Sequence, residues 1–106
     1  MAGRTTEEAS QMISTRKLSA SKVRVTFELP DDGHAVGVAG EFNGWDPSAL
    51  PLKKRAGARR ASVVLEPGQR YGFRYRNSEG DWFNDEQAHT YEENQFGEVN
   101  GIIDLS

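Results

Sequence analysis

The stretch VAGEFNGWDP, residues 38–47, joins the end of a strand pattern to a tight turn and a tryptophan. Val36, Val38 and Phe42 share one phase of an alternating pattern, as on a strand with one buried face. The Asn-Gly pair favours a tight turn because both residues tolerate positive φ, and the Asp-Pro pair bends the chain again. Trp45 therefore stands on a rigid turn, either as a plug for the core or as a platform for a ligand.

Apolar and polar residues alternate in several further segments on both sides of this stretch. Strands with one buried and one solvated face are predicted at residues 23–29, 35–42, 50–53, 61–66, 71–76, 82–83 and 99–105. Glycine- and proline-containing turns separate them, and none of these segments has a convincing helical period. About seven short strands of this kind favour an antiparallel β-sandwich, with a small closed barrel as the structural alternative.

Two stretches lack this apolar alternation. Residues 1–20 are polar and poor in aromatic residues, so we expect a disordered N-terminal extension ahead of one folded domain spanning residues 21–106. Residues 84–93 are also polar, and we expect them to form a surface loop.

Composition narrows the classes of function. The chain of 106 residues has a formal net charge of −3, which makes it a poor general binder of nucleic acid. No apolar run approaches the about 20 residues that a membrane helix needs, so no membrane partner is expected. The chain contains no cysteine, which favours a reducing compartment, and we expect a cytoplasmic location. His34 and His89 lack metal-ligand spacing, so neither a metal nor another cofactor is expected.

Two charged clusters have competing interpretations. Asp85 and Glu86 are adjacent carboxylates, but glycoside hydrolysis needs two carboxyl groups that face each other across a cleft at about 5–10 Å. We therefore expect no catalytic activity. The basic cluster is either a solvated hairpin tip or a contact for an anionic partner. It consists of Lys53, Lys54, Arg55, Arg59 and Arg60.

Five ordered blocks of sequence resemble a known family. They are VAGEFNGWD at 38–46, LPL at 50–52, YGFRY at 71–75, DWFND at 81–85 and FGEVNGII at 96–103. In order and spacing they resemble the family 48 carbohydrate-binding modules. That family includes the glycogen-binding domain of the AMP-activated protein kinase β subunit and the early-set N-terminal domains of isoamylases and glycogen-branching enzymes. The resemblance covers roughly residues 21–105.

This resemblance implies an immunoglobulin-like β-sandwich of the early-set type and a non-catalytic site for α-1,4-glucan. The site residues that it implies are Trp45, Arg74, Trp82, Phe96, Glu98 and Asn100. The glycogen-binding domain typically has Lys at the position of Arg74 and a small hydroxyl residue at that of Glu98. It often has Leu where Phe96 stands. The implied partners are an α-glucan and a glucan-metabolising enzyme or kinase subunit.

The residue types suit a neutral sugar polymer. Pyranose rings expose C–H faces that stack on indole, and two tryptophans at an angle follow a curved glucan where one does not. Arg74 donates and Asn100 both donates and accepts hydrogen bonds, as sugar hydroxyls require. In a simpler interpretation, Arg74 is an ordinary exposed strand residue, Asn100 satisfies backbone groups at the start of a strand, and Glu98 is a solvated surface group. The alternative function is an accessory protein-interaction domain of a glucan-metabolising enzyme, without a sugar site of its own.

Overall fold

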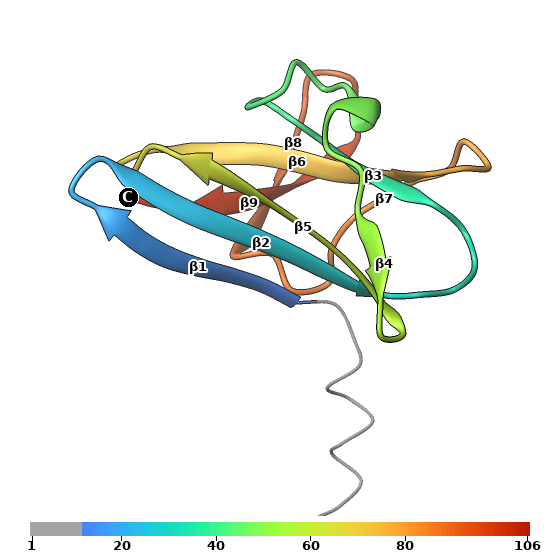
Figure 1. Cartoon of the computed structure of the whole chain (residues 1–106). Helices are drawn as coiled ribbons and strands as arrows, with labels where there is room; N and C mark the ends of the chain where they lie inside the picture. The colour runs from blue at the N-terminus through green and yellow to red at the C-terminus, as the bar shows by residue number, and fades with distance from the viewer. Residues whose placement is uncertain (1–11) are drawn as a thin grey trace, which may run out of the picture.

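The computed structural model describes residues 12–106, which form two stacked antiparallel sheets (Figure 1). Sheet A has the order β1 (Met12–Ser19), β2 (Lys22–Pro30), β5 (Ala58–Leu65) and β4 (Lys53–Arg55). Sheet B has the order β3 (Val36–Gly40), β6 (Arg70–Asn77), β9 (Val99–Asp104) and β8 (Thr90–Glu93), and β7 (Trp82–Phe83) pairs with β6. One 3-10 turn, η1 (Pro47–Ala49), lies between β3 and β4. The predicted all-β sandwich is confirmed.

The core lies between the sheets and is built by the predicted alternation. Val25, Phe27, Val38, Phe73 and Tyr75 are fully buried. The rings of Phe27 and Phe73, from opposite sheets, have centroids 5.3 Å apart, and those of Phe73 and Tyr75 are 5.7 Å apart. Each such buried side chain stabilises the fold by about 1.5–3 kcal/mol relative to solvent exposure, so this aromatic cluster locks the two sheets together.

The prediction of a disordered extension over residues 1–20 was wrong for β1, which pairs with β2 along its length. Residues 1–11 lie outside the described residues. β1 is an edge strand held mainly by backbone hydrogen bonds, and Ile13 is its partly buried contact with the core. A strand with so little apolar burial leaves no hydrophobic period in the sequence.

The prediction of a surface loop over residues 84–93 was likewise wrong at its end, where residues 90–93 form edge strand β8. The side chains of β8 are mostly exposed, so its pattern is polar. Its order comes from pairing with β9, which the sequence of β8 alone does not encode.

The chain crosses from one sheet to the other just after η1. Pro51 forms a β-bridge with Gly37, with the amide of Val38 donating to the carbonyl of Leu50 at 2.9 Å. The strand predicted for residues 50–53 is therefore a single bridge at Pro51, and the strand β4 begins at Lys53 and takes an edge position of sheet A. Gly37 is required here, because a Cβ atom would lie 2.0 Å from the carbonyl oxygen of Pro47. Among the described residues, no helix is long and apolar enough to cross a membrane.

Asp31 fastens the turn after β2 to the β4–β5 hairpin. Its carboxylate accepts from the amide of Gly33 at 2.9 Å and from Nε of Arg59 at 2.9 Å, and it pairs with Nζ of Lys54 at 3.2 Å. The Gly33 amide and the two cations lower the pKa of Asp31 to about 2. Two members of the predicted basic cluster are therefore neutralised within the fold.

Replacing Asp31 with Asn is expected to destabilise the protein at neutral pH, because Arg59 and Lys54 lose their counter-charge. The native pKa of about 2 lies below the ordinary value of 3.8, so the carboxylate stabilises the fold above pH 3.8 and this contribution is lost as the pH falls towards 2. Thermal unfolding followed by circular dichroism should show a Tm difference that is largest near neutral pH and shrinks in acid. Asp32→Asn is the matched control, because an amide oxygen can still accept from the amide of His34. Equal losses in both variants would contradict the clamp.

Candidate functional site

A groove of about 790 Å³ lies on the outer face of sheet B. β6 and β9 form its floor, and the β3–β4 connection and the β8–β9 hairpin rise beside each other as its walls (Figure 1). The structure brings all of the predicted site residues to this groove: Trp45, Arg74, Trp82, Phe96, Glu98 and Asn100. Their part in binding stays a prediction, but their assembly from four separate segments is a property of the fold.

Alternation along β6 shapes the groove floor. Phe73 and Tyr75 point into the core, so Gly72 and Arg74 face outwards. A Cβ atom on Gly72 would lie 3.5 Å from Nδ2 of Asn100 and 3.7 Å from Cδ of Glu41. A Cβ atom would therefore be in ordinary van der Waals contact with both groups, and the glycine keeps this part of the groove floor free of a side chain.

Trp45 is held by a loop that the Asn43 side chain organises. Oδ1 of Asn43 accepts from the amides of Gly40 at 3.0 Å and Asp46 at 3.3 Å, and Nδ2 donates to the carbonyl of Val38 at 2.9 Å. Trp45 adopts a φ of 61°, in the left-handed region, which costs a non-glycine residue about 1 kcal/mol or more. Its side chain is 37% exposed, so it is not a core plug. The loop thus keeps the Trp45 indole partly exposed although the Trp45 backbone is strained.

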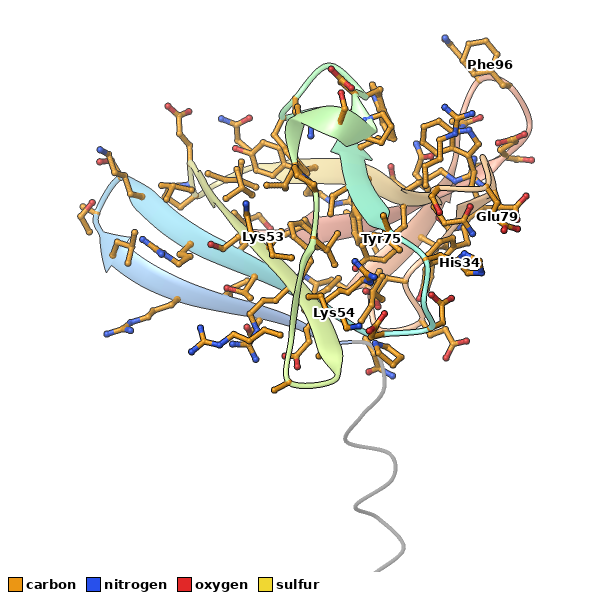
Figure 2. All side chains as sticks on the ribbon, turned by 45° about the vertical axis from the view of Figure 1, so that its right-hand side comes forward. His34, Lys53, Lys54, Tyr75, Glu79 and Phe96 are labelled. Atoms are coloured by element: carbon orange, nitrogen blue, oxygen red, sulfur yellow. The ribbon has the colours of Figure 1, made fainter. Side chains whose placement is uncertain are left out.

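The β8–β9 hairpin repeats this arrangement around Asn94. Oδ1 of Asn94 accepts from the amides of Phe96 at 2.8 Å and Glu98 at 3.1 Å, while Nδ2 donates to Oδ1 of Asn100 at 3.2 Å. Phe96 is 80% exposed and stands out from the hairpin tip (Figure 2). The hairpin therefore carries an apolar ring at its tip and an amide at its base.

Arg74 links Trp82 to Glu98. Its guanidinium forms an ion pair with the Glu98 carboxylate and lies 5.8 Å from the centroid of the Trp82 ring. The guanidinium of Arg76 lies 5.4 Å from the same ring. The Trp82 indole, 40% exposed, is therefore steadied by two cations while much of its surface stays free. Nε of Arg74 is buried and has no hydrogen-bond partner among the described residues.

Several groove residues were missed by the sequence analysis. Arg76 is not part of the groove lining but lies against Trp82, and it shares the outward phase of Arg74 on β6, so its signal was present in the alternation. Glu41 accepts from the amide of Gly72 at 2.9 Å, and Arg70 pairs with Glu92 at 2.7 Å. Glu92 lies on β8, which the sequence analysis placed in a loop.

Asp85, expected in a surface loop, is fully buried. Its carboxylate accepts from the hydroxyl of Tyr75 and from the amide of Gln87, and its carbonyl accepts from the hydroxyl of Tyr91. Burial raises the pKa of Asp85, and burial beside this carboxyl raises the pKa of Tyr75. Asp85 thus anchors the chain between β7 and β8. Within residues 12–106, no group of three or more His, Cys, Asp or Glu side chains is arranged to hold a metal ion.

A family model described as the glycogen recognition site of AMP-activated protein kinase matches residues 23–106. The chain belongs to this family. The resemblance to the family 48 carbohydrate-binding modules is thereby confirmed, and membership indicates a non-catalytic, glycogen-recognising domain. The family match begins after β1, so that edge strand lies outside it. No curated protein sequence matches the chain.

Solved structures show the same fold in a larger protein. The enterobactin esterase of Shigella flexneri, determined with 2,3-dihydroxy-N-benzoyl-serine, is 11% identical with a TM-score of 0.74, over 99% of this chain and 35% of the esterase. The same esterase determined with enterobactin has 11% identity and a TM-score of 0.70 over the same shares of the two chains. The chain thus spans about a third of the esterase's length, and the likeness shows the fold alone.

Replacing Asn43 with Ala should destabilise the protein by about 1–3 kcal/mol, because buried backbone groups lose their partners. It should also loosen Trp45, which iodide quenching of its fluorescence in a Trp82→Phe background would report. Asn43→Asp keeps the acceptor for the amides of Gly40 and Asp46 and loses the donor to Val38, so an intermediate effect is expected. Unchanged quenching in both variants would show that the loop holds Trp45 by other contacts.

Proposed function

We propose that the chain binds α-1,4-glucan, as glycogen, starch or malto-oligosaccharide, in the groove on sheet B. The observation that carries this proposal is the convergence of Trp45 and Trp82, both partly exposed, on one groove with Arg74 and Asn100. The groove volume of about 790 Å³ lies within the range of about 300–1,000 Å³ that small-molecule sites occupy.

Each wall and the floor supply a different interaction with a sugar chain. Trp45 and Trp82 offer indole faces to C–H patches, and Phe96 adds apolar contact at the hairpin tip. Asn100 and Arg74 line the groove, and in this proposal they donate hydrogen bonds to sugar hydroxyls. Because every hydrogen bond to a sugar replaces one to water, the expected Kd is on the order of micromolar to millimolar.

Glu98 contributes through Arg74 rather than through the ligand. Its ion pair orients the guanidinium on the groove floor, 5.8 Å from the centroid of the Trp82 ring. The family resemblance implies a neutral hydroxyl group at this position, so the Arg74–Glu98 ion pair is a departure of this chain from that pattern. An orienting role leaves binding of a neutral glucan independent of the net charge at Glu98.

The wider role that follows is the targeting of a glucan-metabolising enzyme or kinase subunit to glucan, in a cytoplasmic setting that the cysteine-free composition supports. Membership of a family described as a glycogen recognition site supports a non-catalytic role. The alternative, an accessory protein-interaction domain without a sugar site, predicts that no glucan binds.

Titration with maltoheptaose or β-cyclodextrin, followed by tryptophan fluorescence and amide NMR shifts, tests the proposal. Trp45→Ala and Trp82→Ala should each weaken binding by about tenfold or more, and the double variant should show none. Val64→Ala is the matched control, because Val64 is similarly exposed, at 44%, but lies on sheet A. Silence at millimolar ligand would refute glucan binding, and binding that survives the double variant would refute the groove.

Arg74→Ala should weaken glucan binding by about tenfold, because it removes hydroxyl donors and one support of Trp82. Glu98→Gln should change the affinity by less than about threefold, since an amide oxygen still accepts from Arg74 and the ligand is neutral. Calorimetric titration at two salt concentrations measures both effects. A large loss in Glu98→Gln would instead assign Glu98 a direct ligand contact.

A further inference from the structure

The outer face of sheet A gathers positive charge in a chain of net charge −3. Burial alternates along β2, so Lys22, Arg24, Thr26 and Glu28 point away from the core, and residues paired with them share that face. The basic residues at these outward positions are Arg16, Lys22, Arg24, Lys53, Arg55 and Arg60. Among the described strand positions of this face, Glu28 is the acidic one. We call it the cationic face.

The cationic face differs from the basic cluster seen in the sequence. Lys54 and Arg59 point to the other side of sheet A, where they pair with Asp31. Arg16 and Arg24 join instead from β1 and β2. The fold therefore splits one run of basic residues and builds a broader surface from three separate stretches.

Like charges lie directly opposite each other on this face. Arg16 is paired with Arg24 across β1 and β2, and Lys53 with Arg60 across β4 and β5. Directly opposed like charges destabilise a sheet. Glu28 forms an ion pair with Arg60, with 3.1 Å between Oε1 and Nη2, and so reduces the repulsion between Lys53 and Arg60. Within residues 12–106, no ion pair joins Arg16 or Arg24 to a carboxylate. An external anion bound between them would remove this repulsion.

We propose that the cationic face docks on a carboxylate-rich surface of a partner protein. Arginine predominates over lysine, as in protein interfaces, and its planar guanidinium binds carboxylates in a bidentate manner. A row of hydroxyl groups from Ser14, Thr26 and Ser62 runs across β1, β2 and β5 beside the arginines and supplies further hydrogen bonds.

Two other anionic partners fit the face less well. Single-stranded nucleic acid is held by aromatic platforms, and the outward positions of the described sheet A strands carry none. Insertion into a membrane surface uses large apolar side chains, and the exposed large apolar residues of the described sheet A strands are two aliphatic ones, Leu18 and Val64. A sheet face with arginines, hydroxyl groups and few exposed aliphatic side chains instead has the composition of a protein contact.

The cationic face and the groove lie on the outer sides of opposite sheets. Occupation of one therefore leaves the other accessible. This inference does not rest on the proposed glucan site, and a variant such as Trp45→Ala should bind an acidic partner unchanged.

Fluorescence anisotropy with labelled poly-L-glutamate as the probe tests the proposal, beside a DNA duplex and phosphatidylserine vesicles. Poly-L-glutamate should bind in preference to both, with an affinity that falls as salt is raised. The double variant Arg16→Gln, Arg24→Gln should weaken binding by about tenfold or more. Ser78→Glu with Gln87→Glu is the matched control, because it changes the net charge equally at exposed positions outside sheet A.

The unfolding temperature of the double variant distinguishes a loss of binding from a loss of stability. Removal of the opposed like charges should leave Tm equal or higher. Arg16→Gln alone, on the edge strand, gives a second and milder variant. Absence of poly-L-glutamate binding would overturn the proposal. Equal or tighter binding of DNA or vesicles, or an equal loss in the matched control, would also overturn it.

Discussion

The alternation of side chains along β6 builds the core on one face of the strand and the groove floor on the other. Phe73 and Tyr75 fill the space between the sheets, and Phe73 packs against Phe27 from the opposite sheet. The same period turns Arg74 and the bare backbone of Gly72 outwards onto the groove floor. A slip of one residue in the pairing of β6 would bury the arginine and expose the aromatic rings, so core and groove share one register.

Two asparagine side chains hold the loops that form the walls of the groove. Asn43 and Asn94 each satisfy backbone amides within a tight loop, and each loop carries an aromatic ring, Trp45 or Phe96. Because the loops are tied to strand ends by side-chain hydrogen bonds, they hold their rings without apolar burial. The left-handed backbone at Trp45 shows that this position is maintained against local strain.

Charge is sorted between the two outer faces. In the groove, Arg70 and Arg74 are paired with Glu92 and Glu98, which suits a neutral ligand. On the cationic face of sheet A, Arg16 and Arg24 have no ion-pair partner within residues 12–106, which suits an anionic ligand. One small sandwich thereby offers two chemically distinct surfaces that do not compete for space.

The sequence by itself determined the sandwich, most of the strands that build the core, and the family. The core strands are predictable because inward-facing residues such as Val25 and Phe27 alternate with outward-facing ones along a short segment of the chain. It did not determine the edge strands β1 and β8, whose order comes from pairing with β2 and β9 rather than from burial. The predicted groove residues followed from the ordered blocks.

Their partners did not follow from the sequence. Three contacts join residues that are distant along the chain. Arg74 pairs with Glu98, Asp85 is buried against Tyr75, and Lys54 of the basic cluster pairs with Asp31. Only tertiary structure decides such contacts, because register and sheet stacking choose which outward side chains meet.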